Sequence, residues 1–137
     1  MGRSAPRKAE LDAEIADLRS QAANLRANAS EARALAEDEG SERRAGFESN
    51  VAELRANALQ LQAQALEVRA AIAERDGSPS AIAEARKMAV KAIELKAEAV
   101  EVMATVATAA EGAELLAQAS ELRGKARAIH TACAVPS

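Results

Sequence analysis

Apolar residues recur at alternating spacings of four and three along most of the chain, and this pattern constrains the fold more than any other feature. Such spacing places them on one stripe of a helix, as in heptad repeats whose stripe faces a partner helix. Alanine supplies 38 of the 137 residues, and Phe47 is the only aromatic residue. Because alanine is the strongest helix former, we predict an all-α fold. We expect an elongated bundle of three to four long Ala-rich helices with coiled-coil (heptad) packing.

Two glycine-containing segments interrupt the helical pattern. The first is EDEGSERRAG, around Gly40, and the second is RDGSPS, around Gly77. In the second segment Gly77 suits a helix C-cap, Ser78 an N-cap and Pro79 the first turn of the following helix. The chain is therefore expected to turn sharply at both places.

A further glycine, Gly112, falls inside the last helical pattern, where the heptad phase also slips. Glycine is about 1 kcal/mol less favourable than alanine in a helix interior, so we predict a bend or break there. The chain then forms a single helical domain over residues 9–132, with tails at 1–8 and 133–137. The expected helices span about 8–38, 43–75, 79–111 and 113–132.

The first apolar stripe carries most of the large side chains, and we predict that it forms the core within one subunit. Its members share the heptad spacing and are Leu11, Ile15, Leu18, Leu25, Phe47, Val51, Leu54, Leu61, Val68, Ile72, Met88, Leu95, Val102, Val106, Leu115, Leu122 and Ile129. Between these residues stand the charged and amide side chains that are typical of heptad flanks.

A second apolar stripe lies roughly opposite the first in the second and third expected helices, at 100° per residue. In the first helix the matching stripe holds only small residues, from Ala13 to Ala34, and a neutral exposed surface explains it equally well. Three or four helices in one chain rarely cover two such helices on both sides, so we predict that the second stripe contacts another subunit or partner. The predicted interface comprises Ala52, Ala56, Leu59, Ala63, Leu66, Val90, Ile93, Ala97, Val100 and Ala104.

Charge and hydropathy argue against two other classes of partner. The formal net charge is −3, without a basic stripe or aromatic residues for base stacking, so nucleic-acid binding is not expected. The charge-free runs are far shorter than the roughly 20 residues of a transmembrane helix. The basic N-terminus lacks the apolar run of a signal peptide. We expect a soluble protein, in the cytoplasm or within an assembled particle.

The sequence offers little for catalysis or metal binding. His130 is the only histidine, and with Cys133 it has the spacing of half a zinc site, but no second pair exists. Acidic residues that could resemble a carboxylate cluster alternate with lysines, which is typical of a solvated, ion-paired helix face. We therefore predict that the protein is not an enzyme and binds no metal or cofactor.

These observations favour a non-enzymatic, self-assembling structural or scaffold protein that forms an oligomer, a filament, a shell or part of a virion-like particle. One alternative is a helical adaptor or chaperone-like module that binds a partner helix along an exposed seam. A second alternative, which ranks last, is an amphipathic coat for a lipid or granule surface. Binding to a membrane surface is not expected, because such helices usually carry Trp or Phe on the apolar face and Lys or Arg beside it. On the first hypothesis, glutamate at Leu59 or Leu66 should disrupt assembly, whereas glutamate at Leu54 or Leu61 should unfold the subunit.

Overall fold

The structure of the protein is a computed structural model that describes residues 4–134, with side chains described for residues 7–132. Within this range the chain is all-α, which confirms the predicted fold class. Residues 4–8 and 133–134, which were assigned to the two tails, belong to helices. The other residues assigned to the tails, 1–3 and 135–137, lie outside the described range. The helices are α1 (Ser4–Leu35), α2 (Glu42–Asp76), α3 (Pro79–Ala104) and α4 (Ala109–Ala134).

The turn between α2 and α3 uses the three residues that the sequence indicated. Gly77 caps α2 in the left-handed conformation, with φ 75°, which a glycine adopts without steric cost. The Ser78 hydroxyl accepts a hydrogen bond from the Ala81 amide at 3.2 Å, and Pro79 stands in the first turn of α3. The two helices therefore reverse direction over two residues.

The turn between α3 and α4 lies at residues 105–108, and the predicted break at Gly112 is wrong. The Thr105 hydroxyl donates to the Val102 carbonyl at 2.6 Å, and the Thr108 hydroxyl accepts from the Glu111 amide at 3.3 Å. Threonine side chains that bond to nearby backbone compete with helix continuation, so this pair ends one helix and caps the next. Gly112 instead lies in α4, where an added Cβ would come within 3.5 Å of the Ala104 carbonyl oxygen.

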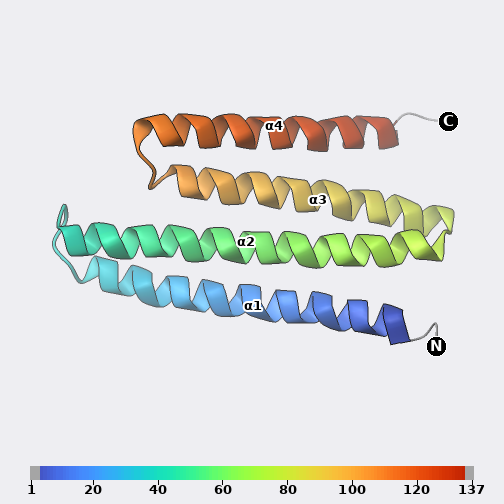
Figure 1. Cartoon of the computed structure of the whole chain (residues 1–137), viewed down its shortest axis with the longest axis horizontal. Coiled ribbons are helices and arrows are strands. Elements are labelled where there is room, and N and C mark those ends of the chain that lie inside the picture. Colours follow the sequence, from blue (N-terminus) through green and yellow to red (C-terminus); the bar gives the residue numbers. More distant parts are fainter. Residues whose placement is uncertain (1–3, 135–137) are drawn as a thin grey trace.

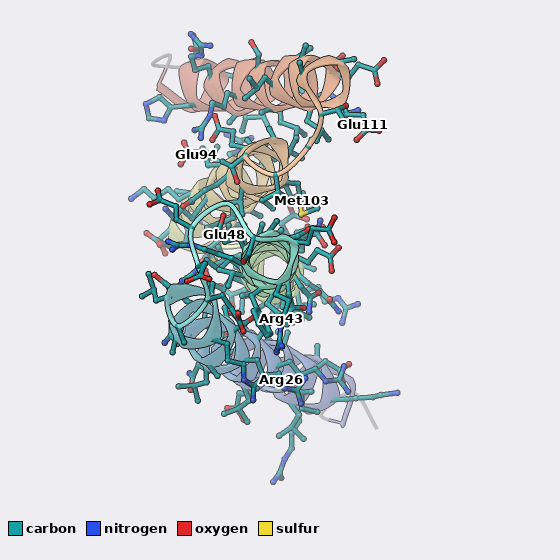
Figure 2. All side chains as sticks on the ribbon, turned by 90° about the vertical axis from the view of Figure 1, so that its left-hand side faces the viewer. Arg26, Arg43, Glu48, Glu94, Met103 and Glu111 are labelled. Atoms are coloured by element: carbon teal, nitrogen blue, oxygen red, sulfur yellow. The ribbon has the colours of Figure 1, made fainter. Side chains whose placement is uncertain are left out.

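The four helices run up and down in a single layer (Figure 1). Each helix contacts its neighbours in sequence: α1 with α2, α2 with α3, and α3 with α4; no other pair of these helices is in contact within the described residues. Viewed along the layer, the helices stack one above another, with α1 and α4 at opposite edges (Figure 2). The bundle is therefore open, with two inner helices and two edge helices.

Small residues fill the contacts between the helices. Leu95 is the only buried apolar residue larger than alanine in the described part of the chain. Alanine contacts let helix axes approach toward the short end of the usual range of about 8–10 Å. The closeness of α1 and α2 is visible in Ser20, whose buried hydroxyl donates to the Ala58 carbonyl of α2 at 2.9 Å.

Enlarging one of these alanines should force two helices apart. Ala65 is fully buried against Ala13 and Ala16 of α1, so we expect Ala65→Leu to lower the free energy of unfolding by about 1–3 kcal/mol, as overpacking usually does. Ala71→Leu is the matched control, because Ala71 is exposed on the same helix. Urea unfolding followed by circular dichroism measures both, and equal stability of the two variants would contradict close packing at Ala65.

Candidate functional site

Both apolar stripes of α2 are covered inside the chain. On one side Ala65 packs with Ala13 and Ala16 of α1, and on the other Ala63 packs with Ala92 and Leu95 of α3. Leu59 and Leu66 pack against this second cluster. These two leucines therefore face α3, and the prediction that they point outward to another subunit is wrong.

The second stripe of α3 faces α4 in the same way. Ala97 is fully buried, and one turn further along this face Glu101 forms an ion pair with Arg123 of α4. None of the ten residues predicted for a subunit interface is exposed. Four are buried, namely Ala52, Ala56, Ala63 and Ala97, and the other six, Leu59, Leu66, Val90, Ile93, Val100 and Ala104, are half-buried. An open layer gives each inner helix two neighbours, which explains why these residues need no second subunit.

The predicted core divides into a covered group and an exposed group. Leu95 is buried, and eleven others are half-buried: Phe47, Val51, Leu54, Leu61, Val68, Ile72, Met88, Val102, Leu115, Leu122 and Ile129. Val106 lies in the turn between α3 and α4 and is exposed. All four residues predicted for the core from α1 are also exposed, which contradicts their assignment.

These four residues, Leu11, Ile15, Leu18 and Leu25, form what we call the α1 stripe. Their exposed fractions range from 44% at Ile15 to 68% at Leu25. The alanines that continue the same spacing, at 22, 29 and 32, are exposed as well. The α1 stripe is therefore a continuous apolar face on an edge helix, and exposed faces of this kind commonly mark interaction sites.

The opposite face of α1 explains why the stripe points outward. It carries only small residues, and those at 13, 16, 20, 23, 27, 30 and 34 are all buried against the rest of the chain. Ser20 bonds to the Ala58 carbonyl, and Ser30 donates to the Phe47 carbonyl at 3.3 Å. Large residues on this face would hold the helices too far apart for these bonds. The uniform smallness of the face was the signal in the sequence that it meets a close neighbour.

Ion pairs hold the register of neighbouring helices. Arg69 contacts Asp17 at 2.5 Å between α2 and α1, and Lys96 contacts Glu67 at 2.7 Å between α3 and α2. Between α4 and α3, the hydrogen bond from Arg123 to Glu101 raises the pKa of that arginine. Such partly exposed pairs contribute about 0–1 kcal/mol each, so they align the helices more than they stabilise them.

The charges beside the α1 stripe are arranged differently. One flank carries Asp12, Arg19, Arg26 and Arg33, and the other carries Arg7, Glu14, Gln21 and Asn28. Within the described residues, none of the ion pairs involves the charged members of either flank. Arg26 is labelled on α1 at the lower edge of the layer in Figure 2. The charged side chains of the two flanks are therefore available to a partner that covers the stripe, whereas Asn28 already accepts a hydrogen bond from Arg55 of α2 at 3.4 Å.

A groove lies between the N-terminal half of α3 and the C-terminal half of α4. It has a volume of about 460 Å³ and is lined by Ala83, Arg86, Lys87, Val90, Lys91, Glu94 and His130. It contains no nucleophile with an adjacent base, which covalent catalysis requires. Cys133, the residue that would join His130 in half a zinc site, has no described side chain, and the described residues contain no cluster of three metal-binding side chains. The absence of enzymatic activity stays a prediction.

None of the described helices combines the length and apolar character needed to cross a membrane. Comparison with known proteins gives no further guide, because no family model, curated protein or solved structure matches the chain.

The contact between α2 and α3 and the outer edge of α1 predict different effects of the same substitution. Leu66 packs in the α2–α3 contact, so Leu66→Glu should lower the free energy of unfolding by about 2 kcal/mol or more, through lost packing and a poorly solvated charge. Leu18 is 62% exposed, so Leu18→Glu should change the stability of the dilute protein by less than about 0.5 kcal/mol. Chemical unfolding at low protein concentration compares them. Similar losses for both variants would mean that α1 does not present Leu18 to solvent.

Proposed function

We propose that this protein is a non-enzymatic, self-assembling structural or scaffold protein whose subunits associate through the α1 stripe. The observation that carries the proposal is the position of four large apolar side chains on the outer face of an edge helix, at heptad spacing. The stripes of the inner helices are already covered within the chain. The edge therefore replaces those stripes as the proposed assembly surface.

The expected strength of this association is modest. Burying a Leu or Ile side chain is worth about 1.5–3 kcal/mol, and roughly half of each side chain in the α1 stripe remains exposed. A pair of copies would gain roughly 6–12 kcal/mol in this way, against an association cost of about 4–15 kcal/mol. The surplus corresponds to association in the micromolar range or weaker, so assembly should depend on protein concentration.

The adaptor function is the alternative proposal, with the same surface and a different occupant. A helix of another protein could dock on the α1 stripe through the same spacing of apolar anchors. One observation favours the surface coat as a further candidate: Arg19, Arg26 and Arg33 follow one flank of the stripe, and basic residues beside an apolar face favour anionic surfaces. Both alternatives allow a chain that stays monomeric on its own.

Size-exclusion chromatography with light scattering tests the proposal. We expect the apparent mass to rise above 14.3 kDa as the concentration increases from micromolar to several hundred micromolar. The double variant Leu18→Glu with Leu25→Glu should remain monomeric, because association of two copies would bury four negative charges in an apolar contact. Refractive-index detection is required, since the chain has no Trp or Tyr.

Leu116→Glu is the matched control, because Leu116 is similarly exposed, at 54%, but stands on α4. It should assemble as the unmodified protein does. A chain that stays monomeric over the whole range would overturn the proposed function. Assembly that survives the double variant would instead keep the function and exclude the α1 stripe as its surface.

A further inference from the structure

We propose that the occupant of the α1 stripe is a second copy of this chain, paired α1 to α1 in parallel and in register. This inference rests on the proposed function and names the contact that it uses. In such a pair each residue of the stripe meets its own copy across a twofold axis. Each layer then extends away from the shared α1–α1 contact, because α2 packs on the opposite face of α1.

The order of residues in the stripe suits two parallel strands. Leu11, Leu18 and Leu25 occupy successive d positions, and Ile15 occupies the a position between the first two. A β-branched residue at a with leucine at d favours parallel dimers over trimers and tetramers. The pairing would bury three layers of leucine and one layer of isoleucine between the two copies.

The charges on the two flanks supply the stronger argument. Arg7, Glu14, Gln21 and Asn28 form the flank at heptad position g, and the other flank, from Asp12 to Arg33, is at position e. In a parallel pair, each g residue lies beside the e residue five positions later on the other helix. Arg7 then meets Asp12 of the second copy, and Glu14 meets Arg19 of the second copy. The twofold axis repeats both contacts, which gives four pairs of opposite charge. The remaining flank positions pair Gln21 with Arg26 and Asn28 with Arg33, so no like charges meet on the flanks. The one contact between like charges is Lys8 with Lys8 of the second copy, at the exposed a position near the start of α1.

Antiparallel pairs fit less well. The register that keeps the whole stripe in contact places Leu25 beside Ile15 of the other copy and brings Arg19 against Arg19. Its contacts between opposite charges are the two between Asp12 and Arg26, half as many as in the parallel pair. A shift by one heptad removes that repulsion but places Leu25 beside Lys8. In these two registers Gln21 lies beside Gln21 or beside Glu14 of the other copy, respectively.

The opposite edge of the layer is a poorer partner for the stripe. Among the described residues α4 exposes one large apolar side chain, Leu116, at 54%. A single leucine buries less apolar area than the three leucines and one isoleucine of a second α1 stripe. The parallel α1–α1 pair therefore combines the greatest apolar burial with the most favourable charges.

Substitution of Gln21 distinguishes the orientations because it is exposed and lies outside the apolar stripe. In the parallel pair Gln21→Glu adds two contacts with Arg26 and should tighten the dimer about 2- to 10-fold. Gln21→Arg, the matched control at the same site, should weaken it by a similar factor. Analytical ultracentrifugation of the full chain gives the dissociation constants. Weakening of the dimer by Gln21→Glu would indicate antiparallel pairing. An unchanged dissociation constant in both variants would mean that position 21 does not contact Arg26 of the other copy. Either result overturns the proposal.

Disulfide cross-linking tests the register of the pair directly. Leu25→Cys in a chain with Cys133→Ser should form a covalent dimer under oxidised glutathione, because a parallel pair brings the two introduced thiols within bonding distance. In the full antiparallel register the two positions are ten residues apart along the axis, about 15 Å, and no bridge can form. Ala71→Cys with Cys133→Ser, on the exposed face of α2, controls for random collisions and should remain monomeric on a denaturing gel.

The measurements separate this inference from the proposed function. An unmodified chain that stays monomeric would contradict both the proposed function and the parallel pairing. A chain that assembles through the α1 stripe, yet is weakened by Gln21→Glu and forms no disulfide at position 25, would keep the self-assembling function and overturn the parallel pairing.

Discussion

Contact between alanines on adjacent helices is the interaction on which this structure depends. Because a methyl group occupies little space, the backbones come close enough for Ser20 and Ser30 of α1 to donate to carbonyls of α2. Each such contact buries little area, so the chain needs long helices to accumulate enough of them. The same closeness leaves larger side chains, such as Leu59 and Leu66, beside the line of contact and half-buried.

A single layer follows from this way of packing. Small-residue faces are nearly flat and can sit on opposite sides of a helix, so α2 and α3 each hold two neighbours without a shared core. A closed bundle would need one broad apolar sector on each helix. The layer instead ends at α1 and α4 (Figure 1), and an edge helix is the place where further copies or partners can be added without disturbing the subunit.

The sequence predicted the helices well and their neighbours less well. Local signals at Gly77, Ser78 and Pro79 located one turn correctly, because capping depends on adjacent residues. Periodicity also identified the two helices with two apolar faces. Periodicity could not decide which face of a helix meets which neighbour, since Leu18 and Ser20 lie on opposite faces of α1 that both have the heptad spacing. Side-chain size suggested the opposite of what the structure shows: large residues were expected inside, although the closest helix contacts admit only small ones.

The edge therefore differs in kind from the interior. Inside the chain, alanine and serine set the spacing and the helices are covalently linked, so weak contacts suffice. Between copies no linker holds the helices together, and association must overcome the loss of translational and rotational freedom. Leucine and isoleucine, which bury several times more apolar area than alanine, are found at the edge. Since anything that binds the folded state stabilises it, pairing of the α1 edges would also stabilise a layer whose interior is made almost entirely of small side chains.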